Sequence, residues 1–202
     1  MTTAHIAVPK LRVVQNFLVK RGIDLAGSCA MLLAFAPLFV FVAALIKLDS
    51  EGPALFRQKR IGKDGEPFDI WKFRSMRVDA HPYARSPVGN SDPRLTKVGR
   101  VLRRLSIDEL PQLVNVLKGE MSLLGPRPEM PYIVEQYGPL ERQRLCIRPG
   151  ITGLWQISPA RAMPIHENLT YDLTYIENQC FGLDCVILLR TITAVIRGVG
   201  AT

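Results

Sequence analysis

The sequence predicts a mostly helical protein of the α/β class, in which a bent apolar helix precedes a compact domain with a small β hairpin. The first observation is a stretch of 22 residues without a charged side chain, 25–46, with Pro37 near its middle. The second is a pair of strand-like segments around a turn at 62–66. The third is helical spacing of apolar residues in later segments, among them 183–196. A chain of 202 residues is long enough for one domain with a core and an anchoring helix.

The uncharged stretch is long enough to enter a membrane. A helix over residues 25–46 would be about 33 Å long, which matches the hydrocarbon core of a bilayer. A buried core helix is one alternative, and 22 uncharged residues in succession argue against it. A signal peptide is the other alternative, and the lack of a clean small-residue cleavage site before Lys47 argues against that.

The flanking charges favour a helix that enters and leaves the membrane on the same side. Lys20 and Arg21 precede the stretch, and Lys47 follows it with further basic residues beyond. The positive-inside rule places both flanks in the cytoplasm, which a straight span cannot satisfy. Because proline lacks an N–H group and clashes with the preceding turn, Ala36-Pro37 is expected to bend or break the helix. We therefore prefer a re-entrant, monotopic helix-break-helix to a simple span.

The chain accordingly divides into three parts. They are an N-terminal basic segment, 1–19, a re-entrant membrane segment, 20–50, and a cytoplasmic, interfacial domain, 51–202. The net charge is +8, and its excess lies early: residues 51–104 hold thirteen basic and six acidic side chains, whereas 105–202 hold eight and ten. Such a basic region suits nucleic acid, anionic lipid or a phosphate-bearing small molecule.

Composition excludes several classes of protein. Apolar residues make up 48% of the chain, which excludes intrinsic disorder. Four cysteines without a C-x-x-C pair, together with only three histidines, argue against a structural zinc site and against a disulfide framework. Reduced thiols in a cytosolic compartment are therefore expected.

Local patterns predict the elements of the domain. Residues 55–61 and 67–73 are predicted to form two strands joined by an Asp-Gly turn, and 79–93 an exposed loop. Apolar spacing predicts a helix over 95–105. The remaining predicted helices are a short one through Leu113–Leu117 that ends at Gly119, and a last one over 183–196, which is either a core helix, the default, or an amphipathic helix on the membrane.

Asp108-Glu109 is the acidic pair with most chemical interest. One interpretation is structural, because Ser106 followed by Glu109 matches a capping box, and acids favour the first turn of a helix. The other is that a carboxylate among many cations serves an anionic substrate, as a nucleophile or as a Mg²⁺ ligand. The neighbouring cations in the sequence are Arg94, Lys97, Arg100, Arg103, Arg104, Lys118, Arg127 and Arg148.

Two basic residues are candidates for binding phosphate. Arg127 is either an ordinary surface arginine or a guanidinium held in place between Pro126 and Pro128 for bidentate contact. The segment from Lys72 to Met76 is either a charged outer face of a strand or a source of further phosphate contacts. No Walker, G-x-S-x-G or G-x-G-x-x-G motif is present, and the histidines form no catalytic pattern.

Taken in order, these segments resemble the bacterial sugar transferase family, the monotopic phosphoglycosyl transferases, from about Lys20 to Arg190. The basic start with Asp24 and the apolar segment with a central proline come first. The motifs that follow are Gly52-Pro-Ala-Leu-Phe-Arg-Gln-Lys-Arg-Ile-Gly62, Trp71-Lys-Phe-Arg-Ser-Met76, Asp92-Pro-Arg-Leu-Thr-Lys-Val-Gly99, Leu105-Ser-Ile-Asp-Glu-Leu-Pro-Gln112, Gly125-Pro-Arg-Pro-Glu129 and Arg148-Pro-Gly-Ile-Thr-Gly153.

The resemblance implies a reaction, a fold and a set of site residues. Members of the family move a sugar 1-phosphate from a UDP-sugar to a polyprenyl phosphate and release UMP. The resemblance assigns Asp108 as the nucleophile that forms a covalent phosphosugar intermediate. Glu109 would hold Mg²⁺, with Asp108, or assist proton removal. The family's phosphate-binding positions fall on Lys72, Arg103, Arg127 and Arg148. The fold implied is a compact catalytic domain, 51–202, with interfacial helices around the hairpin.

The resemblance also implies partners and a location. We expect Mg²⁺ as cofactor, undecaprenyl phosphate and membrane lipid as partners, and the cytoplasmic face of the bacterial inner membrane as the site of action. A homodimer and downstream glycosyltransferases are further candidate partners. An inactive membrane-bound scaffold and a nucleic-acid-binding module are the alternative functions. The intact Asp108-Glu109 pair argues against the first, and the 22-residue apolar segment against the second, so no nucleic-acid partner is expected.

Two departures from the family pattern stand out. The bend is often Ser-Pro in the family and is Ala36-Pro37 here, so a serine hydroxyl is absent. The Gly153-Leu-Trp-Gln156 run is often followed by a Gly-Arg pair, where this chain has Ser158-Pro-Ala-Arg161. The second departure bears on the local loop and on sugar recognition.

Overall fold

The structure, a computed structural model, describes residues 17–81, 83, 87, 91–163 and 168–196. Most of the predicted N-terminal segment, 1–19, lies outside the described residues, and the first helix begins at Phe17. The chain is mostly helical with a small antiparallel hairpin, as predicted.

The apolar segment forms two helices that meet at the predicted bend. They are α1, Phe17–Ala34, and α2, Ala36–Asp49, and their axes differ by 60°. Pro37 lies in the first turn of α2, where its missing N–H group costs no helical hydrogen bond, so the helix restarts there in a new direction. Within the described residues, neither helix alone has the length and apolar character of a membrane span, but α1 and α2 taken together do.

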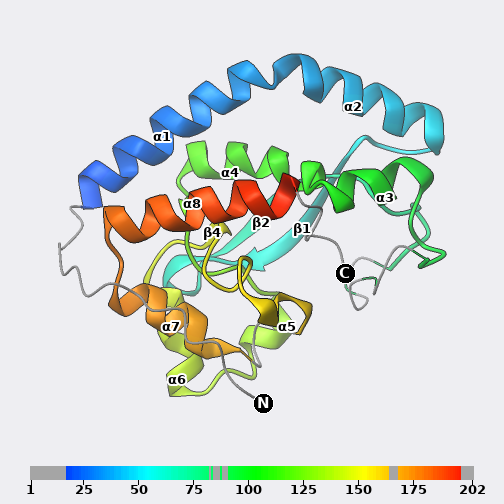
Figure 1. Cartoon of the computed structure of the whole chain (residues 1–202). Coiled ribbons are helices and arrows are strands. Elements are labelled where there is room, and N and C mark those ends of the chain that lie inside the picture. The colour runs from blue at the N-terminus through cyan, green and yellow to red at the C-terminus, as the bar shows by residue number, and fades with distance from the viewer. Residues whose placement is uncertain (1–16, 82, 84–86, 88–90, 164–167, 197–202) are drawn as a thin grey trace.

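Polar side chains of α1 fasten the bent pair to the rest of the chain. Arg21 donates hydrogen bonds to the carbonyl oxygens of Val116 and Leu117 at 2.7 and 3.1 Å. The buried Asp24 carboxylate accepts a hydrogen bond of 3.0 Å from the Leu123 N–H. Figure 1 shows the result, an arch in which α1 lies over α4, Leu113–Lys118, and α8, Phe181–Ile196, while α2 lies over α3, Lys97–Arg104.

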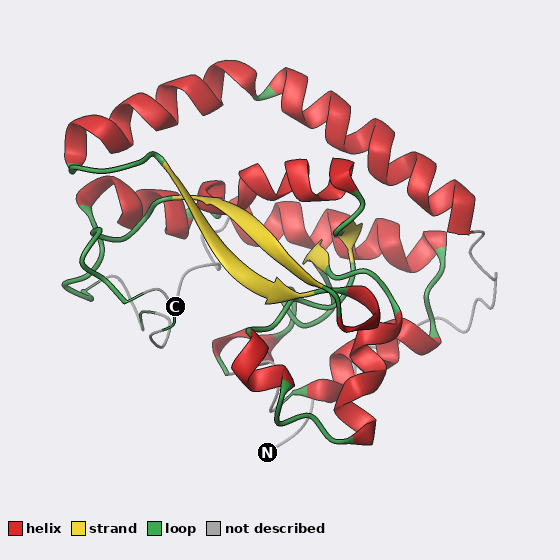
Figure 2. Cartoon of the chain, turned by 180° about the vertical axis from the view of Figure 1, so that it is seen from behind, coloured by secondary structure: helices red, strands yellow, loops and turns green. Residues whose placement is uncertain are grey.

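The predicted hairpin is confirmed. Strands β1, Leu55–Ile61, and β2, Pro67–Phe73, pair antiparallel with Leu55 opposite Phe73. A short turn, η1, Lys63–Gly65, joins them, and Gly65 has the positive φ of 85° that favours glycine there. The hairpin crosses the middle of the molecule, below the arch and above the short helices α5, Pro131–Val134, and α6, Pro139–Arg142 (Figure 2).

The helices after the hairpin follow the prediction, but the capping box does not. Helix α3, Lys97–Arg104, lies within the predicted 95–105, and α4, Leu113–Lys118, ends at Gly119, which has φ 88°. Between them lies a 3-10 segment, η2, Ile107–Gln112. Ser106 has the left-handed φ of 54°, and its side chain makes no capping hydrogen bond. The capping-box interpretation is therefore wrong, because the Glu109 side chain pairs with two cations instead.

A second, smaller sheet brings two Pro/Gly segments together. Strands β3, Ser122–Leu124, and β4, Gly150–Thr152, pair in parallel, and no local pattern predicts such short strands. Gly125 and Gly150 make this contact possible, since a Cβ atom on Gly150 would lie 2.1 Å from the Gly125 nitrogen. The loop that carries Arg127 is therefore held directly against the segment that follows Arg148.

The core interpretation of residues 183–196 is confirmed, and the last helix also has an exposed apolar face; its placement on the membrane stays a prediction. Helix α8, Phe181–Ile196, buries Leu183 and Ile187 in a core cluster with Tyr175. Its other face exposes large apolar side chains, Leu189 at 65% and Ile192 at 50%. The remaining elements are η3, Gln143–Cys146, η4, Pro159–Ala162, and α7, Leu169–Glu177.

Candidate active site

A cavity of about 190 Å³ lies between the hairpin and the end of α3. It has apolar walls, which include Phe73 and Met130. Among the residues that the structure describes, its charged lining consists of five basic side chains and one acidic side chain, a balance that suits a substrate with several negative charges. These charged residues are Arg60, Lys72, Arg74, Arg77, Arg103 and Asp108.

Asp108 is the acid of this cavity. It lies in η2 with only 6% of its surface exposed, and among the described residues none donates a hydrogen bond to its carboxylate. Burial, and then the charge of Glu109, raise the pKa of Asp108. A carboxylate that lines a cationic cavity and accepts no hydrogen bond from the described residues is free to bond with a ligand.

Glu109 turns instead toward two cations. Its Oε1 atom lies 2.9 Å from Lys72 Nζ and 2.7 Å from Arg127 Nη2, and its Oε2 atom accepts from Arg127 Nη1 at 3.3 Å. Burial alone would raise the pKa of Glu109, but Arg127 and Lys72 outweigh it and hold that pKa well below its usual range. Glu109 is therefore charged at neutral pH and fixes the two cations beside Asp108.

The local fold explains why Lys72, Glu109 and Arg127 meet. Alternation along the hairpin places Arg57, Lys59, Asp69 and Trp71 on its outer face, where Lys59 pairs with Asp69 and Arg57 lies 4.0 Å from the Trp71 ring. Lys72 lies on the other face, so the interpretation of this segment as an outer strand face is wrong for Lys72. Arg127 is not an ordinary surface arginine either, because its guanidinium is paired with Glu109.

The other predicted phosphate-binding residues are distributed unevenly. Arg103, in the last turn of α3, lines the cavity with Lys72 and Asp108. Arg148 is not among the residues that line it: Nε donates to the Gly119 carbonyl at 2.7 Å, and the guanidinium lies 5.0 Å from the Phe17 ring centre. The structure thus brings Lys72, Arg103, Arg127 and the acidic pair together and leaves Arg148 at the end of α4.

Arg74 lines the cavity, but the backbone already occupies its guanidinium. It donates to the carbonyl oxygen of Ser50 at 2.8 Å and to that of Glu51. Because these carbonyls follow the last turn of α2, Arg74 ties the bent helix pair to the end of β2. The expectation that the segment from Lys72 to Met76 supplies further phosphate contacts therefore applies to Lys72 more than to Arg74.

Arg60 and Arg161 are among the arginines near the site that sequence reasoning missed. Arg60 lines the cavity, and burial together with the charge of Arg127 lowers its pKa to about 10. Strand alternation could have found it, because Arg60 and Lys72 lie on the same face of the hairpin. Arg161 belongs to the loop that departs from the family pattern. Burial and the nearby Arg127 lower its pKa, so this departure reaches the edge of the site.

The acidic pair fits a Mg²⁺ ion in part. No cluster of three or more His, Cys, Asp or Glu side chains suited to a metal occurs in the described part of the chain. Mg²⁺ is often held by one or two carboxylates together with substrate phosphates, and the unpartnered Asp108 suits that role. Both oxygens of Glu109 are engaged by Lys72 and Arg127, so the donor set on the protein is Asp108 rather than the pair.

Comparison with known proteins identifies the family. The model of the bacterial sugar transferase family matches residues 15–198. The chain belongs to this family. One bacterial sugar transferase relative, from Aeromonas hydrophila, is named UDP-N-acetylgalactosamine-undecaprenyl-phosphate N-acetylgalactosaminephosphotransferase. It is 41% identical over 189 residues, which cover 91% of this chain and 45% of the relative.

Two further relatives differ in length. UDP-glucose:undecaprenyl-phosphate glucose-1-phosphate transferase of Escherichia coli K12 is 40% identical over 88% of this chain and 40% of its own length. Exopolysaccharide production protein PSS of Rhizobium leguminosarum bv. phaseoli is 39% identical over 92% of this chain and 99% of its own. The chain thus spans less than half of the longer bacterial sugar transferases and nearly all of a short one.

Proposed function

We propose that the protein transfers a sugar 1-phosphate from a UDP-sugar to undecaprenyl phosphate and releases UMP. The observation that carries the proposal is Asp108, an unpartnered carboxylate in a cavity lined by five basic side chains. The relatives named above, which act on UDP-sugars and undecaprenyl phosphate by name, support the substrates. The exopolysaccharide relatives support a role at the start of glycan assembly.

In the first step, a carboxylate oxygen of Asp108 attacks the β-phosphorus of the UDP-sugar. The bond between that phosphorus and the oxygen that bridges to the α-phosphate breaks, and UMP leaves with the electron pair. The phosphosugar is then held on Asp108 as an acyl phosphate. Arg103 and Lys72, which line the same cavity, neutralise the charge that develops on the phosphate oxygens.

In the second step, a phosphate oxygen of undecaprenyl phosphate attacks the same phosphorus. The bond to Asp108 breaks, which restores the carboxylate and yields the lipid diphosphosugar. No proton has to move if the acceptor enters as a dianion. Because its pKa is held low, Glu109 is a poor base, and we assign to it the positioning of Lys72 and Arg127.

We propose Mg²⁺ as the cofactor, held by Asp108 with phosphate oxygens of the donor, where it would neutralise phosphate charge. A role of Glu109 as a ligand requires that it release Lys72 or Arg127. We further propose that the bent pair inserts into the cytoplasmic leaflet of the inner membrane. Its exposed apolar side chains, among them Leu33 at 78% and Val40 at 72%, would then contact lipid.

Intact mass spectrometry tests the covalent mechanism. Detergent-solubilised protein is incubated with Mg²⁺ and a panel of UDP-sugars, without acceptor. We expect one donor to add the mass of one sugar phosphate and to release one equivalent of UMP per chain. Undecaprenyl phosphate should then restore the original mass. UMP release that requires the acceptor and leaves no adduct contradicts the covalent step, and no UMP with any donor favours an inactive scaffold.

Cysteine labelling tests the re-entrant topology. The exposed Cys29 and Cys146 and the partly exposed Cys185 are first replaced by serine, which leaves the buried Cys180. One accessible cysteine is then placed at Phe17 or at Leu48, the exposed outer ends of α1 and α2. We expect a membrane-impermeant maleimide to label both positions in inverted vesicles and neither in intact spheroplasts, because the bend at Pro37 returns the chain to the same side. Labelling of the two positions from opposite sides contradicts re-entry.

A further inference from the structure

The loop that carries Arg127 is held by hydrogen bonds along its whole backbone. Four successive carbonyl oxygens, those of residues 126–129, each accept a hydrogen bond from outside the loop. The donors are, in order, the Gly150 N–H at 2.8 Å, Arg144 Nη2 at 2.9 Å, Arg60 Nη1 at 3.2 Å and the Ile61 N–H at 3.0 Å. Two of these four donors, Arg60 and Arg144, are side chains, and Arg60 also lines the cavity.

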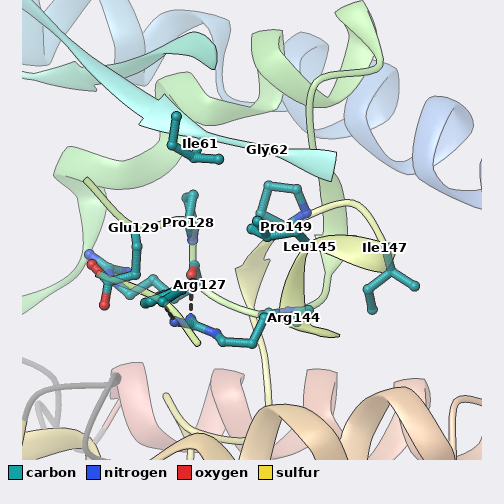
Figure 3. Close-up of a pocket in the computed structure, with 11 residues that line it drawn as sticks. Ile61, Gly62, Arg127, Pro128, Glu129, Arg144, Leu145, Ile147 and Pro149 are labelled. Carbon is teal, nitrogen blue, oxygen red and sulfur yellow. Dashed lines mark hydrogen bonds between the residues drawn. The ribbon is translucent and has the colours of Figure 1, made fainter. Parts of the chain in front are cut away.

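Arg144 reaches the loop from behind the site. It lines a separate gap of about 10 Å³, which is too small for a substrate. In Figure 3 its side chain approaches the Arg127 carbonyl from below, on the opposite side of the loop from Ile61. Arg144 is 4% exposed, so it can act on the reaction only through the residues that it contacts.

The Arg144 guanidinium is itself anchored at two further points. Its Nε atom lies 2.7 Å from Asp172 Oδ2, and both side chains are 3% exposed. Its Nη1 atom donates to the buried Tyr137 hydroxyl. The Arg144 guanidinium thus joins α7, through Asp172, to the backbone carbonyl of Arg127. The Arg127 side chain in turn pairs with Glu109.

We infer that Arg144 is a positioning residue for the proposed transfer: anchored by Asp172, it sets the backbone of Arg127 and thereby the placement of the Arg127 guanidinium against Glu109 and the substrate phosphates. A lysine cannot replace it, because one ammonium group cannot pair with Asp172 and also reach both the Tyr137 hydroxyl and the Arg127 carbonyl, which the guanidinium contacts through three separate nitrogens. Lysine can, however, keep the charge pair with Asp172 and so keep the interior neutral.

The test measures the rate constant of the UMP burst under single-turnover conditions, which does not depend on how much of a preparation is folded. Reactions run at about pH 8, where Asp172 is ionised, since burial raises the pKa of Asp172 to about 6. We expect Arg144→Lys to lower the rate constant at least 10-fold with the burst amplitude retained. Arg142→Lys, on the exposed side of the same segment, should leave the rate constant unchanged.

A double-mutant cycle decides whether Arg144 acts through Arg127. We expect Arg144→Lys combined with Arg127→Lys to be no slower than Arg127→Lys alone. Multiplied effects in the double variant would overturn the inference, as would a wild-type rate constant in Arg144→Lys. Asp172→Asn, which removes the anchoring charge, should lower the same rate constant, and a wild-type value there also counts against it. The inference rests on the proposed function, and a wild-type protein that releases no UMP from any donor, with or without acceptor, refutes that function instead.

Discussion

Asp108→Asn is expected to abolish UMP release and, at the same time, to make the protein more stable at neutral pH. The rate loss, at least about 1000-fold, follows from removal of the proposed nucleophile. The gain in stability follows from the raised pKa of Asp108, which shows that its charge is unfavourable in the folded protein. UMP release per chain and thermal unfolding in detergent measure the two effects.

The stability difference between Asp108→Asn and wild type should depend on pH. Below the ordinary Asp pKa of 3.8, Asp108 is neutral in both the folded and the unfolded chain, and the variant and wild type should be equally stable. The advantage of the variant should grow as the pH rises from 3.8 toward the folded-state pKa of Asp108 and should be complete above that value. Asp69→Asn, on the outer face of the hairpin, is the control and should change neither property. A variant less stable than wild type at neutral pH contradicts this account.

Glu109→Gln is expected to have the opposite effect on stability. Glutamine keeps the shape of the side chain but leaves Lys72 and Arg127 without their shared counter-charge. Removal of one charge from a largely buried ion pair lowers the free energy of unfolding by about 3 kcal/mol. We also expect UMP release to slow about 100-fold, because the two cations lose their fixed positions.

The lowered pKa of Glu109 also predicts how the stability loss in Glu109→Gln depends on pH. Its carboxylate contributes stability above the ordinary Glu pKa of 4.5, and that contribution is lost as the pH falls through the folded-state value. The stability gap between the variant and wild type should therefore be full at neutral pH and should close in acid. Glu135→Gln, an exposed position, is the control for denaturant unfolding. Equal stability of Glu109→Gln and wild type at neutral pH contradicts the pairing.

Local sequence patterns predicted the parts of the fold that local forces determine. Strand alternation and the Asp-Gly turn are enough for the hairpin, and a proline in mid-helix is enough for the bend at Ala36-Pro37. The parallel pair β3–β4 could not be found in this way, because three-residue strands carry no periodicity.

The site was harder to predict, since it depends on contacts between distant segments. Ser106 and Glu109 match a capping box locally, yet the pull of Lys72 and Arg127 on Glu109 decides the outcome. Arg148 carries a phosphate-binding role by resemblance, but in the fold its side chain bonds to the end of α4. The order of the motifs indicated which residues meet, and the fold shows which of them remain free for a ligand.

The buried Asp24 and the Arg21 bonds to α4 have a consequence for how the proposed membrane protein sits in its bilayer. If a flexible linker joined the membrane helix to the domain, the distance between the cavity and the bilayer surface would vary. Here α1 is hydrogen-bonded to the domain, so the two keep one relative position. The depth of the molecule in the bilayer is then set by these contacts rather than by the thickness of the membrane. The phosphate of the lipid acceptor must then reach a site at a fixed height above the bilayer. We therefore expect the rate of transfer to differ between bilayers of different thickness.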